Sequence, residues 1–300
     1  ISACLVGSEM CIRDSLDRRV LQLVPTRDGQ DVLRTEDGEY WRTYAYIART
    51  VPRMSVRTTE DAFAAARAFG EFAAALSDLP ADTLHETIPS FHDTPARFDA
   101  LMRAIDADAC NRAASAKDEI LTALAFESLA PALFRIAAQA QLPARATHND
   151  TKITNVLFDE HTGEAVCIVD LDTVMPGLTL FDVGELVRTA ATRAAEDEPD
   201  ARKVTVEPEL FEAVAAGFIA GAGAVLCPAE LDAFVTAGKV LAYENGLRFL
   251  TDHLNGDTYF RVHRPNQNLD RARAQLALVS SMERQEEDLR RRLAAATAQA

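Results

Sequence analysis

The polar residues of segment 148–155, HNDTKITN, have the types and spacing needed to transfer a phosphoryl group to a hydroxyl. This reaction needs an oriented nucleophile and neutralised phosphate charge more than covalent help from the protein. In the pattern H-x-D-x-x-x-x-N, the Asp accepts or orients the hydroxyl proton, and the Asn five residues later offers a neutral oxygen to Mg²⁺. These positions are Asp150 and Asn155. The segment therefore predicts a catalytic loop for phosphoryl transfer to a small molecule.

Two further acidic residues follow the apolar run 165–169. Asp170 is predicted to bind the Mg²⁺ that bridges the nucleotide phosphates, because hard cations prefer carboxylate oxygen. Asp172 lies on the same side of an extended chain and can support the metal. Lys152, two residues after the base, is placed to reach the transferred phosphate as a point charge. His148 is interpreted as a buried brace of the loop.

A β-hairpin is predicted to position these residues. The apolar runs 156–158 and 166–169 flank the turn-rich segment 159–164. The loop that enters this hairpin and the residue that leaves it then converge at one end. The competing interpretation makes Asp150 a helix cap and the two later carboxylates solvated turn residues.

At these residues the chain resembles the aminoglycoside phosphotransferase and choline kinase superfamily, which shares its core with protein kinases. The fuller resemblance is to the N-acetylhexosamine 1-kinases and extends over roughly residues 16–287. The segments that carry it are YWRTY at 40–44, HETIP at 85–89, FHDTPARF at 91–98, DLDTVMPG at 170–177, GLRFLTD at 246–252 and NLDRAR at 268–273.

The resemblance implies an ATP-dependent kinase that phosphorylates the anomeric hydroxyl of N-acetylglucosamine or N-acetylgalactosamine. Asp150 would be its base, and Asn155 and Asp170 would be its Mg²⁺ ligands. ATP would be the co-substrate and Mg²⁺ the only metal.

The resemblance also implies roles for three residues outside the catalytic pattern. Arg248 and Tyr259 match sugar contacts, although Arg248 could instead hold a surface carboxylate and Tyr259 could be half-buried packing. Asp182 matches a buried residue that braces the backbone of the catalytic loop.

The implied fold is α+β, with a kinase-like arrangement of an incomplete, β-rich small lobe and a large, mostly helical lobe that carries the catalytic hairpin. Strands are expected within 20–24 and 40–47, and helices from Thr58, from Thr94 and from Ser115 onward. The predicted divisions are a small-lobe remnant at 16–48, a hinge that touches adenine at 49–56, a helical lobe at 57–294 with long helices at 208–220, 228–254 and 268–294, and a tail at 295–300.

The beginning of the chain does not fit this pattern. Residues 1–15, ISACLVGSEMCIRDS, contain no initiating Met and show no periodicity leading into the rest. The string is similar to translated sequencing adapters at the ends of genes assembled from environmental reads, so we expect it to be non-native. The kinase pattern places a phosphate-covering loop and a lysine upstream of Leu16, and neither is visible. We therefore expect an N-terminally truncated fragment, nearly inactive and poorly soluble.

Composition restricts the partners. A net charge of −15 argues against a nucleic-acid partner and against an anionic membrane surface. The five cysteines have no metal-binding spacing, and there is no signal-peptide pattern or membrane-length apolar run. A cytoplasmic enzyme that binds a nucleotide and a small sugar is expected.

Two other functions stay open from the sequence. One is a kinase for another hydroxyl compound, such as an aminoglycoside or choline, although a single Trp, Trp41, gives little material for an aromatic cage around choline. The other is a nucleotide-binding pseudoenzyme, against which the intact Asp150, Asn155 and Asp170 argue.

Overall fold

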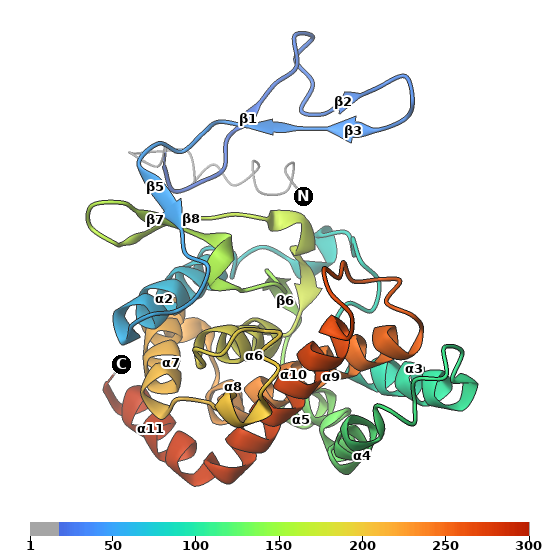
Figure 1. Cartoon of the computed structure of the whole chain (residues 1–300). Helices are drawn as coiled ribbons and strands as arrows, with labels where there is room; N and C mark the ends of the chain where they lie inside the picture. Colours follow the sequence, from blue (N-terminus) through green and yellow to red (C-terminus); the bar gives the residue numbers. More distant parts are fainter. Residues whose placement is uncertain (1–17, 300) are drawn as a thin grey trace.

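The computed structural model describes residues 18–299, so the adapter-like segment 1–15 lies outside the described residues. A small part made of short strands stands above a large helical part (Figure 1). This arrangement confirms the predicted α+β class.

The N-terminal part consists of two antiparallel pairs of very short strands. β1 (Leu23–Val24) pairs with β4 (Thr43–Tyr44), and β2 (Leu33–Arg34) pairs with β3 (Tyr40–Trp41). The strands are shorter than those predicted within 20–24 and 40–47, and turns that contain Gly29 and Gly38, both with positive φ, connect β1 to β2 and β2 to β3. Between residues 18 and 55, Ile47 is the single buried residue.

The predicted hairpin is present and gains a third strand. β7 (Val156–Asp159) pairs with β8 (Ala165–Ile168) on one side and with β5 (Thr50–Pro52) on the other. The segment predicted as a hinge therefore contributes an edge strand to the sheet of the predicted hairpin. Below this sheet, β6 (Arg145–Thr147) pairs with β9 (Met175–Gly177).

Within residues 18–299, ten α-helices build the large part. They are α2 (Thr59–Ala75), α3 (Thr94–Ala107), α4 (Lys117–Ala125), α5 (Ala132–Ala140), α6 (Thr179–Ala190), α7 (Pro208–Ala222), α8 (Pro228–Asp232), α9 (Phe234–Leu254), α10 (Gln267–Arg284) and α11 (Glu286–Gln299). The first begins as predicted, because the Thr58 hydroxyl accepts the Asp61 N–H at 3.2 Å.

Two long helices expected from the sequence are broken in the structure. The 228–254 pattern divides at Ala233 into α8 and α9, and the 268–294 pattern divides at Gln285 into α10 and α11. The Gln285 side chain donates to the Val206 carbonyl at 3.0 Å, which holds the bend. After this bend α11 turns back toward α7 and continues to Gln299, through most of the predicted tail (Figure 1).

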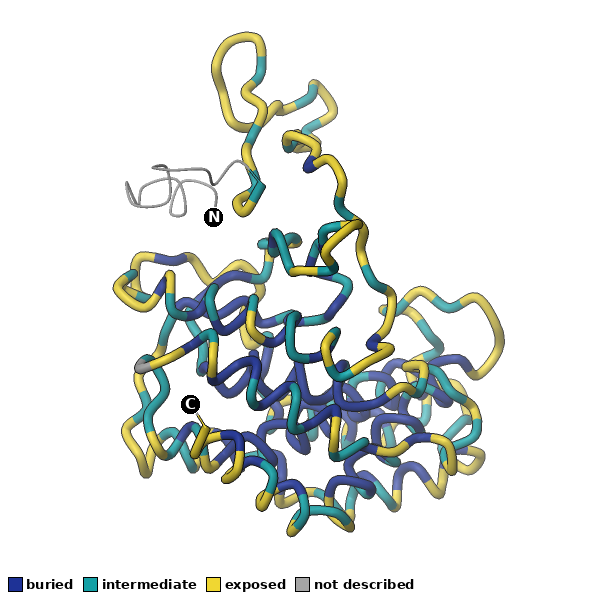
Figure 2. Tube along the Cα trace, turned by 90° about the vertical axis from the view of Figure 1, so that its left-hand side faces the viewer, coloured by how far each residue is buried: buried dark blue, intermediate teal, exposed yellow. Residues whose placement is uncertain are grey.

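The core lies among the helices. α9 is buried along almost its whole length, and Figure 2 shows the buried residues concentrated in the helical part while the N-terminal strands are mostly exposed. α2 and α7 approach so closely that a methyl group added at Gly70, Gly217 or Gly221 would collide with the backbone of the facing helix. Glycine at these positions lets two helices pack with their backbones in contact.

No single helix within residues 18–299 is long and apolar enough to cross a membrane. One helix pair meets the length and composition limits together, Lys117–Ala125 with Glu127–Ala140, and it is bent by 48°.

Candidate active site

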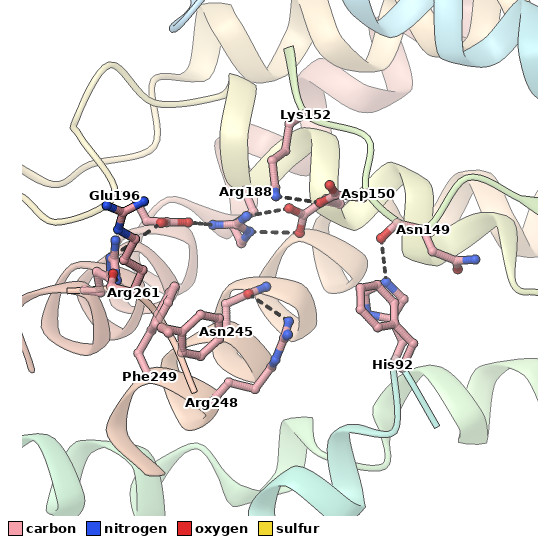
Figure 3. Close-up of a pocket in the computed structure, with 14 residues that line it drawn as sticks. His92, Asn149, Asp150, Lys152, Arg188, Glu196, Asn245, Arg248, Phe249 and Arg261 are labelled. Carbon is pink, nitrogen blue, oxygen red and sulfur yellow. Dashed lines mark hydrogen bonds and ion pairs between the residues drawn. The ribbon is translucent and has the colours of Figure 1, made fainter. Parts of the chain in front are cut away.

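The loop between β6 and β7 brings Asp150 and Lys152 to the wall of a cavity of about 350 Å³ (Figure 3). Acidic, basic, amide and aromatic side chains line the rest of it. These residues are Phe91, His92, Asn149, Glu185, Arg188, Glu196, Asn245, Arg248, Phe249, Phe260, Arg261 and Arg271. The cavity thus joins the predicted base to a polar chamber large enough for a small molecule.

Both carboxylate oxygens of Asp150 are occupied by residues of its own loop. Lys152 Nζ lies 2.7 Å from Asp150 Oδ1, and Asn155 Nδ2 donates to Asp150 Oδ2 at 3.1 Å. Asn155 Nδ2 also donates to the Asp150 carbonyl at 2.9 Å. Burial would lower the pKa of Lys152, but the carboxylates of Asp150 and Glu185 outweigh burial and raise it. Lys152 is therefore a stable cation beside the carboxylate.

The loop backbone is tied to α6 through Asp182, which is fully buried. Its two carboxylate oxygens accept the N–H of His148 at 3.0 Å and that of Asn149 at 2.6 Å, and its carbonyl accepts the Thr151 hydroxyl at 2.6 Å. Burial raises the pKa of Asp182, and the N–H donors act in the opposite direction. These bonds place Asp182 where the sequence predicted a brace.

His148 is buried beneath the loop. Its Nδ1 accepts the Asp150 N–H at 3.3 Å, so its other nitrogen, Nε2, donates to the Val169 carbonyl at 3.1 Å. The ring packs edge-on against Phe69 and Phe72, with centroids 5.2 and 5.7 Å away. His148 thereby connects the backbone of Asp150 with Val169, the residue before Asp170.

Asn155 and Asp170 have the chemistry of a Mg²⁺ site. Both bonds of the Asn155 amide use Nδ2, which leaves Oδ1 for a cation. Asp170 is exposed, adopts a left-handed conformation with φ 61°, and follows Val169, whose N–H donates to the Asn155 carbonyl at 2.9 Å. One amide and one carboxylate suit an ion that keeps phosphate and water ligands. Within residues 18–299, no group of three His, Cys, Asp or Glu side chains suits a metal.

Asp172 has a different environment. Its carboxylate forms an ion pair with Arg42, which lies between β3 and β4. Its carbonyl accepts the Thr87 hydroxyl at 2.9 Å. Asp172 therefore links the N-terminal strands to the catalytic part of the chain.

The two predicted sugar contacts, Arg248 and Tyr259, have different surroundings. The Arg248 guanidinium lies over Phe91 and Phe260, at 5.6 and 5.4 Å from the ring centroids, and lines the cavity next to Asp150. Within the described residues it has no carboxylate partner. Tyr259 is 73% exposed and lines a neighbouring cavity with Arg248, so it does not border the chamber of Asp150.

One buried ion pair in the cavity wall was not predicted from the sequence. Arg188 Nε donates to Glu185 Oε2 at 2.8 Å, and Arg188 Nη1 contacts Glu196 Oε1 at 3.1 Å. Burial would raise the pKa of Glu185, but the guanidinium outweighs burial and lowers it to about 2. The i, i+3 spacing of Glu185 and Arg188 in a helix was a usable signal, but many surface pairs share it.

A second buried network joins three distant segments. His92 Nδ1 lies 2.8 Å from Glu244 Oε1, His92 Nε2 lies 2.8 Å from the Asn149 carbonyl, and the Thr94 hydroxyl donates to Glu244 Oε2 at 2.6 Å. Burial would lower the pKa of His92, but the Glu244 carboxylate outweighs burial and raises it. Nothing in the local sequence indicates this contact, since its partners are 57 and 152 residues away.

The α+β arrangement, with the polar loop of Asp150 entering a β-hairpin and Asp170 leaving it, is that of a kinase-like fold. Two solved structures share the fold. An aminoglycoside phosphotransferase from Alicyclobacillus acidocaldarius is 17% identical with a TM-score of 0.56, covering 99% of this chain and 81% of its own. A microcompartment-associated aminopropanol kinase is 14% identical with a TM-score of 0.54, covering 96% and 82%.

Residues 18–213 match the phosphotransferase enzyme family, which is more than half of the chain. The chain therefore belongs to this family and is a small-molecule phosphotransferase.

Proposed function

We propose that this phosphotransferase uses ATP to phosphorylate the anomeric hydroxyl of an N-acetylhexosamine. The observation that carries the proposal is the position of the Asp150 carboxylate, which borders the cavity. Lys152 Nζ lies 2.7 Å from its Oδ1, and Asn155 Nδ2 lies 3.1 Å from its Oδ2. A carboxylate fixed in this way can accept the proton of a hydroxyl bound in the cavity.

The charge of the cavity favours a neutral sugar over a cationic acceptor. Its lining contains Lys152 and four arginines against the three carboxylates Asp150, Glu185 and Glu196. An aminoglycoside or choline would bring further positive charge to this surplus, which is unfavourable at short range. A sugar instead offers hydroxyl and amide oxygens that arginine N–H groups can bind. Arg248, which has aromatic neighbours and no carboxylate partner in the described chain, is suited to this task.

Each loop residue then has a distinct role. Asp150 accepts the hydroxyl proton, and Lys152 neutralises charge on the transferred phosphoryl group. Asn155 and Asp170 would hold Mg²⁺, which neutralises nucleotide phosphate charge when bound. The backbone near residues 49–56 is proposed to contact the adenine.

A direct assay of acceptors tests the proposal. Purified protein with Mg²⁺ and ATP is incubated separately with N-acetylglucosamine, N-acetylgalactosamine, choline and an aminoglycoside, and ³¹P NMR identifies the product. We expect sugar 1-phosphate from one or both acetylated hexosamines and no product from the cationic compounds.

The same assay includes glucose as a matched acceptor without the acetamido group. Preference for glucose would contradict the N-acetylhexosamine assignment, and product from choline or the aminoglycoside would move it to those acceptors. ATP binding without turnover of any compound would favour either a pseudoenzyme or the nearly inactive fragment expected from the sequence.

A further inference from the structure

The segment Phe91-His92-Asp93-Thr94 leads into the first turn of α3 and has no role in the chemistry described above, yet its His92 contacts the Asn149 carbonyl of the loop directly. His92 is nine-tenths buried and lies between α9 and the loop. We infer that His92 is a positioning residue for phosphoryl transfer, which fixes the Asn149–Asp150 peptide group and thereby the direction of the Asp150 carboxylate. This inference rests on the proposed function, in which Asp150 is the base.

The hydrogen-bond partners of His92 define its protonation. Its Nδ1 faces a carboxylate oxygen of Glu244 at 2.8 Å, and its Nε2 faces the carbonyl oxygen of Asn149 at 2.8 Å. Both partners are acceptors, and neutral imidazole has a single N–H. Only the doubly protonated ring donates both bonds. The buried Glu244 carboxylate, which also accepts the Thr94 hydroxyl at 2.6 Å, supplies the balancing negative charge.

His92 holds the peptide group that joins Asn149 to Asp150. Its carbonyl oxygen, from Asn149, accepts from His92, and its N–H, from Asp150, donates to His148 Nδ1 at 3.3 Å. Asn149 itself has φ 65°, a left-handed conformation that is unfavourable for a residue with a Cβ. Bonds on both sides of the peptide plane keep this conformation, so losing one lets the following carboxylate turn.

The same segment also reaches the acceptor cavity. Phe91 lies beneath the Arg248 guanidinium at 5.6 Å from the ring centroid, and Glu244 and Arg248 lie one helical turn apart on α9. A molecule bound at Arg248 therefore contacts the structure that aims the base. The groups that face His92 and affect its charge are Glu244 from α9, with Glu185 and Asp182 from α6.

Kinetics of two variants test this role. His92→Phe keeps a ring but has no donor, and His92→Gln keeps one amide N–H that can reach the Asn149 carbonyl without carrying charge. We expect His92→Phe to lower kcat by about 10- to 100-fold, the effect of a small displacement of a catalytic group, with KM for ATP changed less than about threefold. His92→Gln should recover most of kcat. His161→Gln, an exposed histidine in the hairpin turn, is the matched control.

The pH profile separates positioning from a purely structural role. In the wild type, kcat should fall as pH rises through the His92 pKa, because the neutral ring loses one of its two bonds. His92→Gln should lack this alkaline limb, since an amide does not titrate. A profile unchanged by His92→Gln, or a His92→Phe variant that loses thermal stability but keeps kcat, would overturn the inference.

A measurement without any acceptor distinguishes failure of this inference from failure of the proposed function. ¹⁵N NMR of histidine-labelled protein near neutral pH should show both His92 nitrogens protonated, and His92→Phe should accelerate hydrogen exchange at the Asp150 amide. A singly protonated ring with unchanged exchange would refute the role of His92, even if an acetylated hexosamine is turned over. Absence of turnover of the acetylated hexosamines, together with the expected NMR result, would refute the sugar assignment and leave the role of His92 intact.

Discussion

The N-terminal strands and the helical part of this protein differ sharply in how their large apolar residues are placed. Tyr40 and Trp41 are 68% and 64% exposed, whereas Phe69 and Phe218 are 0% and 1% exposed. Hydrogen bonds that hold the loop of Asp150 come from α6, from Val169 directly after β8 and from His92 before α3. The position of Asp150, the predicted base, therefore depends on the helical part. The N-terminal strand region contacts the rest of the protein through ion pairs such as that between Arg42 and Asp172.

The strongest way to test this division is to remove the base. Replacing Asp150 by Asn should lower kcat by about 10²- to 10⁴-fold, because general base catalysis is lost. The fold should be unaffected, since Asp150 is near the surface of the loop and its partners remain. Steady-state kinetics with circular-dichroism melting would measure both effects. Asp118→Asn, at an exposed position of α4, is the control, and full activity of Asp150→Asn would refute the assignment.

Truncating the helical core should destabilise the whole fold. Phe69→Ala is expected to lower the free energy of unfolding by about 3–5 kcal/mol, the usual cost of removing a fully buried aromatic ring. It should also disturb His148, because the two rings are in contact at 5.2 Å. Urea denaturation would give the change. A loss below about 1 kcal/mol would show that the core is less tightly packed than the structure indicates.

The buried pair of α6 predicts a dependence on acid. Arg188 lowers the pKa of Glu185 to about 2 from an ordinary value of 4.5. A carboxylate with a lowered pKa contributes stability above its unfolded pKa, and this contribution is lost as pH falls from about 4.5 toward 2. The expected contribution is on the order of 3 kcal/mol. The stability difference between wild type and Glu185→Gln should therefore shrink with acid, and a constant difference would contradict the pairing.

The smallest effect is expected in the N-terminal strands. Trp41→Ala should change the free energy of unfolding by less than about 0.5 kcal/mol, as is usual for exposed positions. Urea denaturation beside Phe69→Ala makes this a direct comparison of the two regions. A loss of several kcal/mol would mean that the strand region belongs to the cooperative core, and it would remove the contrast drawn above.

Sequence alone predicted the parts of the site that are close together in the chain. The hairpin, with Asp150 before it and Asp170 after it, follows from apolar runs and turn residues within about 25 positions. The family match confirms the phosphotransferase class, and the two solved structures confirm the fold. The roles of the individual site residues, and the sugar, stay predictions.

The parts that sequence did not predict depend on contacts between distant segments. His92 was visible within a family-like motif, but its partners Glu244 and Asn149 are brought to it by the packing of α9 and the loop. The segment at 49–56 gave no sign that β5 would pair with β7. The breaks at Ala233 and Gln285 also follow from tertiary packing, because helical periodicity continues through both.

The close packing of α2 against α7 has a consequence for how this protein can vary. At Gly70, Gly217 and Gly221 an added methyl group would meet backbone atoms, which cannot rotate away as side chains do. Single substitutions at these positions are therefore expected not to be tolerated during evolution, because a larger residue would require the distance between α2 and α7 to increase. Phe69 of α2 also contacts the ring of His148. A mutation that moves α2 relative to α7 is therefore expected to disturb the loop of Asp150 as well.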